Sequence, residues 1–183
     1  MGERVEEYRR PDCTWSQSRR SDVILYPSTR LIRLVSDVDP ETPWIYYLGT
    51  AQHETNLATN ERDTEPNGFQ SWGLYQISLA EAASVGLPGV DLLDPVQATQ
   101  VMARLTHRRR DRLRLAAKLA VSDADPPDLW SYVAIAHNQG EAAAVKTIER
   151  FGMNWMEYKR RNRRLNIVSS GYGDDVQPHL MAS

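Results

Sequence analysis

Helix-start signals recur along this chain, and they constrain its fold more than any other feature of the sequence. Ser78-Leu79-Ala80-Glu81 matches a capping box, in which a serine and a glutamate three positions later satisfy the first backbone amides of a helix. Asp39-Pro40, Asp94-Pro95-Val96-Gln97 and Asp125-Pro126-Pro127-Asp128 each place an N-cap residue before a proline that suits the first helical turn. No convincing pair of strands accompanies them. The sequence therefore predicts a mainly α protein.

Apolar residues at helical spacing follow these signals and define the expected helices. We expect a short helix capped by Ser28 or Thr29, and then a helix that begins at Pro40 and ends near Thr55–Asn56. The second of these is the predicted central helix, because its aromatic and aliphatic residues recur at helical spacing. Further helices are expected from 79 onward and over 95–121, 127–139, 141–151 and 154–165.

The length of 183 residues and the hydrophobic content of 41% suit one globular domain. We expect this domain over residues 28–168, with an irregular arm over 1–27 and a flexible tail over 169–183. Cys13 is the only cysteine, which excludes an internal disulfide and a four-thiolate zinc site. The histidines show no spacing typical of a metal site, so we expect neither a metal nor another cofactor.

Charge and hydropathy restrict the expected partners. The formal charge of −2 and the pI near 6.1 give no reason to expect binding to nucleic acid or to an anionic membrane. No apolar run approaches the roughly 20 residues that span a bilayer, and the N-terminal sequence lacks the apolar segment of a signal peptide. The arginine-rich runs Arg108–Arg114 and Lys159–Arg164 are interpreted as solvated helix faces, with binding of phosphate-rich wall polymers as the alternative.

Glu54 is the first candidate for chemistry. It falls in the last turn of the predicted central helix, after turns that are aromatic and apolar. A carboxyl group at such a position loses hydration, which raises its pKa toward that of a useful general acid. A glutamate on a helix is more often a solvated charge than a catalytic group, so the case for Glu54 depends on the neighbouring motifs. His53-Glu54 does not fit the zinc-protease pattern, because Leu57 stands where the second histidine is required.

Two later segments place polar residues at predicted turns. Gly73-Leu74-Tyr75-Gln76-Ile77 is either a loop-to-helix turn with buried apolar side chains, or a turn whose Gln76 and backbone amides face sugar groups. In the second case Gly73 allows close approach of a ligand. His137-Asn138-Gln139-Gly140 ends the fifth predicted helix, where Gly140 suits a left-handed backbone, and its histidine is either incidental or part of a binding site.

Taken in this order, the three segments resemble the lysozyme-like superfamily of peptidoglycan-cleaving enzymes, particularly soluble lytic transglycosylases and goose-type lysozymes. Those families carry a catalytic Glu followed by Ser, a Gly-Leu-Met-Gln-Ile or -Val turn, and Ala-Tyr-Asn-Ala-Gly. This chain has Glu54-Thr55, Gly73-Leu74-Tyr75-Gln76-Ile77 and Ala136-His137-Asn138-Gln139-Gly140. The resemblance covers roughly residues 28–150, and Val38-Asp39-Pro40 is similar to the usual lead-in. It implies a lysozyme-like helical domain with Glu54 as the acid and a substrate-binding set formed by Gly73, Tyr75, Gln76, His137 and Asn138.

Three positions depart from the pattern of those families. Thr55, Tyr75 and His137 stand where the relatives have Ser, Met and Tyr, and that Tyr lies near the catalytic Glu. A histidine there either protonates near neutral pH and lowers the pKa of Glu54 by its charge, or donates one hydrogen bond.

The second catalytic group is left open by the resemblance. The separation of 22 residues between Glu54 and Gln76 (76 − 54) resembles the goose type, but Ser78 stands where some goose-type enzymes carry Asp. Glu65 and Asp63, in the intervening loop, are therefore the candidates for holding an attacking water molecule.

The implied function is cleavage of the β-1,4 bond between N-acetylmuramic acid and N-acetylglucosamine, with peptidoglycan glycan strands as the partner. An anhydro-forming transglycosylase course is preferred to an inverting hydrolysis. The alternatives are a chitinase or chitosanase on a related fold, and a wall-binding or assembly protein of a phage tail or secretion machine with a degenerate site. Without a signal peptide, we expect a protein made in the cytoplasm that reaches the cell wall by another route.

Overall fold

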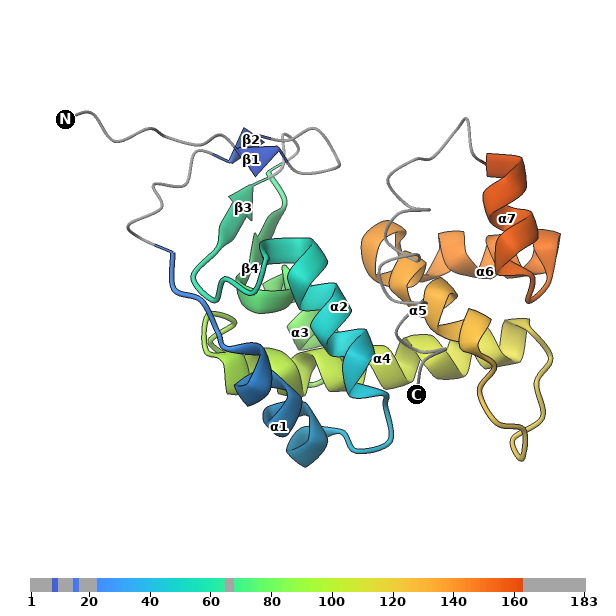
Figure 1. Cartoon of the computed structure of the whole chain (residues 1–183), viewed down its shortest axis with the longest axis horizontal. Helices are drawn as coiled ribbons and strands as arrows, with labels where there is room; N and C mark the ends of the chain where they lie inside the picture. The colour runs from blue at the N-terminus through green and yellow to red at the C-terminus, as the bar shows by residue number, and fades with distance from the viewer. Residues whose placement is uncertain (1–7, 10–14, 17–22, 65–67, 163–183) are drawn as a thin grey trace.

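Helix α4 (Pro95–Ala116) is the longest of the described helices, and the other elements form two groups along it (Figure 1). The structure, a computed structural model, describes residues 8–9, 15–16, 23–64 and 68–162. The first group comprises α1 (Ser28–Val38), α2 (Trp44–Thr55), the strands β3 (Arg62–Thr64) and β4 (Gln70–Trp72), the 3-10 helix η2 (Gly73–Tyr75) and α3 (Leu79–Ser84). The second group comprises α5 (Pro127–Gln139), α6 (Glu141–Phe151) and α7 (Trp155–Asn162).

Helices make up 62% of the described residues and strands 7%, so the predicted mainly α single domain is confirmed. The sequence analysis did not predict the strand pairs. β3 and β4 form an antiparallel hairpin, with Asp63 opposite Ser71. Two short strands, β1 (Tyr8–Arg9) and β2 (Trp15–Ser16), pair within the segment that we expected to be irregular. Strands of two or three residues are too short to show the alternation of polar and apolar residues that identifies a strand in a sequence.

Helix α2 begins at Trp44, four residues after the predicted first residue Pro40. Pro43 explains the delay, because a proline ring disfavours helical geometry in the residue that precedes it. The predicted cap Asp39 is buried instead, and its carboxylate accepts a hydrogen bond from the hydroxyl group of Tyr47 and lies 2.9 Å from Nε2 of His107. A side chain that we expected to cap one helix therefore joins α1, α2 and α4.

The predicted caps Ser78 and Asp94 do begin helices. The hydroxyl group of Ser78 accepts a hydrogen bond from the backbone N–H of Glu81, whose carboxylate accepts one from the backbone N–H of Ser78. The carboxylate of Asp94 accepts a hydrogen bond from the backbone N–H of Val96 at the start of α4. These two helix starts are confirmed, because both depend only on residues close in sequence.

Helix α4 ends at Ala116, five residues before its predicted end at 121. The chain turns at Lys118, which has a φ of +56°. Asp125 does not cap α5, because its carboxylate pairs with the guanidinium groups of Arg110 and Arg114 on α4. These ion pairs hold the loop after α4 against the helix. Helix α5 therefore begins at Pro127, with Pro126 before it and no side-chain cap.

Helix α5, rather than the predicted α2, lies at the centre of the core, since every residue from Leu129 to Ala136 is buried. Aromatic rings attach α2 to its neighbours. The ring centroids of Tyr46 and Trp130 are 5.6 Å apart, and those of Tyr47 and Tyr75 are 6.1 Å apart with the rings edge to face. Pairs of this kind contribute about 0.5–1.5 kcal/mol beyond the area that they bury. They fix the position of α2 relative to α5 and η2.

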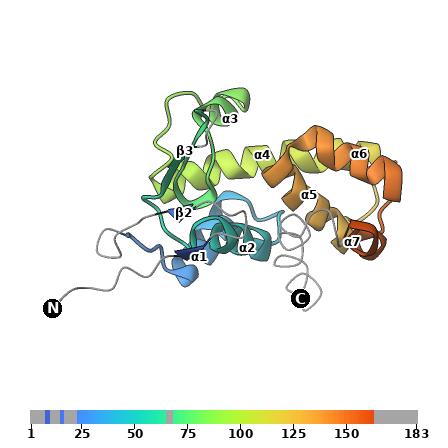
Figure 2. The ribbon, with the colours of Figure 1, turned by 90° about the horizontal axis from the view of Figure 1, so that it is seen from above.

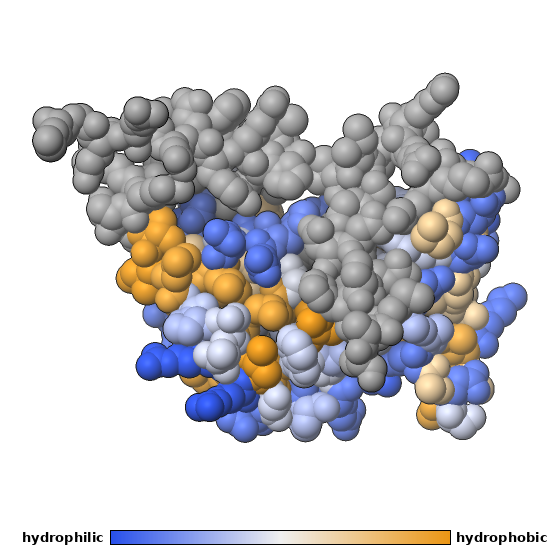
Figure 3. All heavy atoms as spheres, viewed as in Figure 1, coloured by the Kyte–Doolittle hydropathy of each residue, from blue (hydrophilic) through white to orange (hydrophobic). Residues whose placement is uncertain are grey.

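The segment before α1 is hydrogen-bonded to the chain that follows α2. The backbone N–H of Tyr26 donates to the carbonyl oxygen of Leu57 at 2.8 Å, and that of Thr59 donates to Ile24 at 2.9 Å. Ile24 and Tyr26 are therefore hydrogen-bonded to the domain, although they belong to the segment that we expected to be an irregular arm. Ile24 and Leu25 are each 61% exposed, and Figure 3 shows apolar surface over this segment.

Some expectations concern residues outside the described ranges. The predicted flexible tail over 169–183, Cys13, and the predicted extension of the last helix from 163 to 165 all lie there. Within the described ranges, no helix is both long enough and apolar enough to cross a membrane.

Candidate active site

A cleft of about 610 Å³ is lined by residues of both groups of elements and of α4. Figure 2 shows α4 extending from the region of β3 to that of α6. The cleft brings together side chains from α2, the hairpin, the turn after η2, α4 and the end of α5. They include Glu54, Asp63, Gln76, Arg109, His137 and Asn138. Phe69 and Arg112 at its edge are exposed, so the cleft is open to solvent.

Glu54 lies in the last turn of α2, as predicted, with 16% of its side chain exposed. The helix ends at Thr55, and the next two residues, Asn56 and Leu57, have left-handed backbone conformations. Their backbone N–H groups donate hydrogen bonds to carbonyl groups in the last turns of the helix. The hydroxyl group of Thr55 lies 3.2 Å from the carbonyl oxygen of Leu74 in η2. A capped helix end that is also tied to the neighbouring turn therefore positions the carboxyl group in the cleft.

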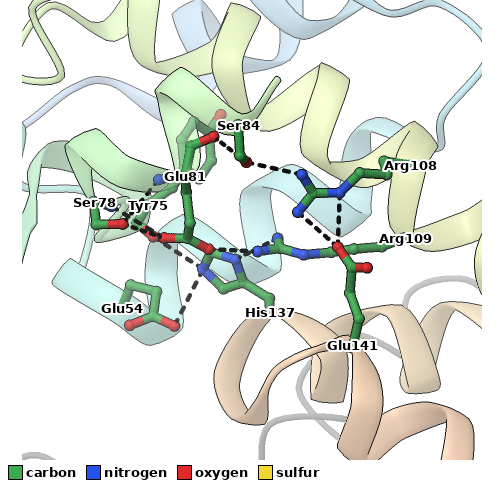
Figure 4. A network of polar contacts seen from close by, with 9 residues as sticks. All are labelled: Glu54, Tyr75, Ser78, Glu81, Ser84, Arg108, Arg109, His137 and Glu141. Carbon is green, nitrogen blue, oxygen red and sulfur yellow. Dashed lines mark hydrogen bonds and ion pairs between the residues drawn. The ribbon is translucent and has the colours of Figure 1, made fainter. Parts of the chain in front are cut away.

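His137 faces Glu54 from the last turn of α5 (Figure 4). Its Nε2 lies 2.9 Å from the carbonyl oxygen of Tyr75 and 3.6 Å from Oε1 of Glu54, and its Nδ1 lies 2.8 Å from the guanidinium group of Arg109. Burial lowers the pKa of His137 to about 3, and the charge of Arg109 acts in the same direction. The imidazole is therefore neutral at physiological pH, which favours hydrogen-bond donation over charge as its effect on Glu54.

Arg109 lies beneath the cleft and is only 2% exposed, although the sequence analysis assigned it to a solvated face. One terminal nitrogen contacts His137, and the other donates to Oε1 of Glu81 at 2.8 Å. The second carboxylate oxygen of Glu81 accepts a hydrogen bond from the backbone N–H of Ser78 at 3.1 Å. Polar contacts thus run from the capping box of α3 to Glu54 (Figure 4).

A second polar cluster lies where α4 meets the start of α6. Glu141 accepts hydrogen bonds of 2.7 Å from both Arg108 and Arg112, and Arg108 also donates to Ser84 at 2.8 Å. Burial alone would raise the pKa of Glu141, but the hydrogen bonds and charges of the two arginines outweigh burial and hold this pKa below its ordinary value. The cluster joins α3, α4 and α6 and gives the cleft one charged wall.

Of the predicted sugar contacts around η2, only Gln76 lines the cleft. Gly73 has a φ of +68°, and a Cβ atom there would lie 1.9 Å from the carbonyl oxygen of Leu92. The glycine therefore allows two backbone segments of this chain to approach, and not a ligand as expected. Tyr75 is fully buried in the core and reaches the site only through its carbonyl group. The amide of Gln76 is held by Ser71 and by the carbonyl oxygen of Gly73.

The candidates for a second carboxylate belong to the hairpin region. Asp63 on β3 lines the cleft, and one of its carboxylate oxygens accepts a hydrogen bond from the backbone N–H of Thr64 at 2.9 Å. Glu65 lies outside the described residues. Asn138 is exposed in the last turn of α5 and also lines the cleft. The structure thus brings Asp63 and Asn138 to the same cleft as Glu54.

Arg109 was not among the predicted site residues, although the sequence of α4 contains a signal for its burial. Val101, Leu105 and Leu113 lie on one face of α4 at spacings of four and eight residues, and all three are buried. Arg109 occupies the position in this series between Leu105 and Leu113. A charged residue at a core position of an amphipathic helix predicts a buried ion pair, and Arg109 forms one with Glu81.

No group of three or more His, Cys, Asp or Glu side chains is arranged to hold a metal ion in the part of the chain that the structure describes. No protein-family model, curated protein or solved structure matches this chain.

Proposed function

We propose that this protein cleaves the β-1,4 bond between N-acetylmuramic acid and N-acetylglucosamine in peptidoglycan. The observation that carries the proposal is the meeting of Glu54, Gln76 and Asn138 in one cleft, although they come from three separate segments. The resemblance in sequence assigns these residues to catalysis and to sugar binding. A cleft of about 610 Å³ is also of a size that holds a small ligand or a short section of a polymer.

Glu54 is the general acid of this proposal. Its carboxyl group transfers a proton to the glycosidic oxygen, the bond between that oxygen and C1 of the muramyl residue breaks, and the electron pair of the bond goes to the oxygen. Positive charge develops at C1 while Glu54 becomes a carboxylate. His137, whose Nε2 is 3.6 Å from Oε1, is the neutral donor placed to stabilise that carboxylate after a small movement.

Two courses are available for the second step. In the preferred course, Glu54 takes the proton of the muramyl 6-hydroxyl group. The oxygen of that hydroxyl group attacks C1, and an anhydro sugar results. In the other course a second carboxylate takes a proton from water, which attacks C1 with inversion. Asp63 is the described carboxylate on the hairpin side of the cleft that would serve the second course.

Replacement of Glu54 by glutamine tests the proposal. Glutamine preserves the shape of the side chain but has no proton to transfer, so the release of soluble fragments from purified peptidoglycan should fall by at least about 10²-fold. The melting temperature should change little, because Glu54 is partly exposed and caps no helix.

Glu149→Gln is the matched control, because Glu149 is exposed on α6 and does not line the cleft. It should release fragments at the wild-type rate. If Glu54→Gln stays within about threefold of wild type, a difference under roughly 0.7 kcal/mol in the barrier, Glu54 is not the acid. A wild-type protein that binds peptidoglycan without releasing fragments would contradict the enzyme and favour a wall-binding or assembly role.

A further inference from the structure

We infer that Arg109 is a positioning residue, which holds His137 in the tautomer that carries its proton on Nε2 and so directs an N–H group toward Glu54. The effect on the reaction rests on the proposed function. The tautomer itself does not depend on that function and can be measured without a substrate.

The donors and acceptors around the imidazole determine this tautomer. A guanidinium group can only donate hydrogen bonds, because it has no acceptor. With a terminal nitrogen of Arg109 at 2.8 Å, Nδ1 of His137 must present its lone pair. On the opposite side, the carbonyl oxygen of Tyr75 can only accept, and it lies 2.9 Å from Nε2. Both neighbours therefore favour the proton on Nε2, and the charged donor at Nδ1 is the stronger of the two.

The burial of Arg109 needs an explanation beyond stability. A buried guanidinium group pays a large desolvation cost, and even a well-formed buried ion pair is often no more stable than apolar residues of the same size. The single carboxylate partner that Arg109 contacts here, Glu81, is 29% exposed and already serves the capping box of α3. No described residue accepts a hydrogen bond from Nε of Arg109. An apolar residue at this position could not donate a hydrogen bond to His137, whereas Arg109 does.

The position of the Nε2 proton matters for the acid beside it. Nε2 lies 3.6 Å from Oε1 of Glu54, too far for a hydrogen bond but within one small side-chain movement of it. When Glu54 loses its proton, an N–H group stabilises the new carboxylate, whereas a lone pair on Nε2 would repel it. The other charged or titratable groups near the ring are His53 on α2 and Glu81, which reaches it through Arg109.

Without the guanidinium donor, His137 should populate both of its neutral tautomers. Arg109→Met leaves Glu81 without its partner, so the informative variant combines Arg109→Met with Glu81→Gln. Glutamine at that position can still complete a capping box. The control is Glu81→Gln alone, which keeps Arg109 beside His137.

The measurement is a long-range proton–nitrogen correlation spectrum of protein labelled with ¹⁵N-histidine, with His137 assigned by comparison with His137→Gln. In the wild type and in Glu81→Gln, we expect Nδ1 unprotonated and Nε2 protonated from pH 5 to pH 8. In Arg109→Met with Glu81→Gln, both tautomers should appear. A wild-type ring protonated on Nδ1 overturns the inference even if the double variant fails to fold, and so does a folded double variant that keeps the Nε2–H tautomer.

The kinetic arm compares fragment release from peptidoglycan by the same two variants. The double variant should be at least tenfold slower in kcat than Glu81→Gln, with a smaller change in KM, because the N–H group acts on the charge that develops during reaction. If the double variant shows both tautomers of His137 but has the same kcat as Glu81→Gln, Arg109 is not a positioning residue for the reaction. If the wild type cleaves nothing, the proposed function fails, while the spectrum still decides whether Arg109 controls the tautomer.

Discussion

Glu54 and His137 meet as a carboxyl group and a neutral imidazole. The sequence left two roles for the histidine, a positive charge near neutral pH or a hydrogen bond. Burial lowers the pKa of His137 to about 3, so it carries no charge at the pH values at which most enzymes work. The resemblance in sequence had no means of showing this, because the residues that bury the ring and the guanidinium group beside it come from other parts of the chain.

The low pKa of His137 predicts a change of stability with pH. Between about pH 3 and the ordinary histidine pKa near 6.5, the unfolded chain binds a proton that the folded protein excludes. The free energy of unfolding should therefore fall as the pH decreases through this window, by up to about 1.4 kcal/mol per pH unit from this group. Urea unfolding of the wild type and of His137→Gln at pH 7, 6, 5 and 4.5 isolates its share.

Because carboxylates also titrate near the lower end of this window, the comparison rests on the difference between the two proteins. His137→Gln should show the shallower fall. Parallel curves for both proteins over the whole range would mean that His137 is not excluded from protonation in the folded state.

Gly73 gives a second prediction at the scale of one residue. Gly73→Ala forces a side chain into a backbone with φ of +68° and against the carbonyl oxygen of Leu92 at 1.9 Å. We expect a loss of about 3 kcal/mol or more, measured by urea unfolding. Gly89→Ala is the control, because its φ is +75° but nothing lies within 4 Å, so only about 1 kcal/mol should be lost. Equal losses at the two sites would contradict the role of the backbone contact.

At the scale of elements, local helix signals were reliable where the side chain had no tertiary partner. Ser78 and Asp94 cap the helices that they were predicted to cap. Asp39 and Asp125 have the same local signal, but their carboxylates contact groups elsewhere in the fold. Asp39 contacts Tyr47 and His107. Asp125 pairs with arginines of α4. A buried, charge-assisted hydrogen bond is worth more than a cap at the surface, so the tertiary partner decides.

The hairpin of β3 and β4 was not predicted, yet it supplies one side of the cleft. Its strands are three residues long and mostly polar. The backbone N–H of Gly73, directly after β4, donates to the carbonyl oxygen of Glu61, directly before β3, at 2.8 Å. Such a pairing leaves no periodic pattern in the sequence, since neither strand buries a continuous face.

The hairpin carries the prediction that concerns a second carboxylate. If Glu54 makes both proton transfers, Asp63→Asn combined with Glu65→Gln should reduce the rate of fragment release by less than about tenfold, because neither residue transfers a proton. Thermal melting of the double variant checks that the hairpin persists. A loss of about 10²–10⁴-fold in a folded variant would instead assign general base catalysis to one of these carboxylates.

At the scale of the whole molecule, α4 makes the site possible. It packs against α1 and η2 in the first group of elements and against α5 and α6 in the second, so the motifs on either side are held at a fixed distance (Figure 1). The order of these motifs and their place at turns could be predicted from the sequence. The burial of Arg109 could also be predicted from its place in the apolar series of α4, but its partners could not, because they are brought to it by α3 and α5.

The measurement that tests the central claim most directly is the mass of the new sugar ends released from purified peptidoglycan in water enriched in heavy oxygen. If Glu54 acts as both acid and base, the wild type releases anhydro-muramyl ends, which are lighter than reducing ends by one water molecule and carry no label. Glu54→Gln then releases none, while Glu149→Gln matches the wild type. Labelled reducing ends from the wild type, or anhydro ends that persist at the wild-type rate in Glu54→Gln, would contradict the account.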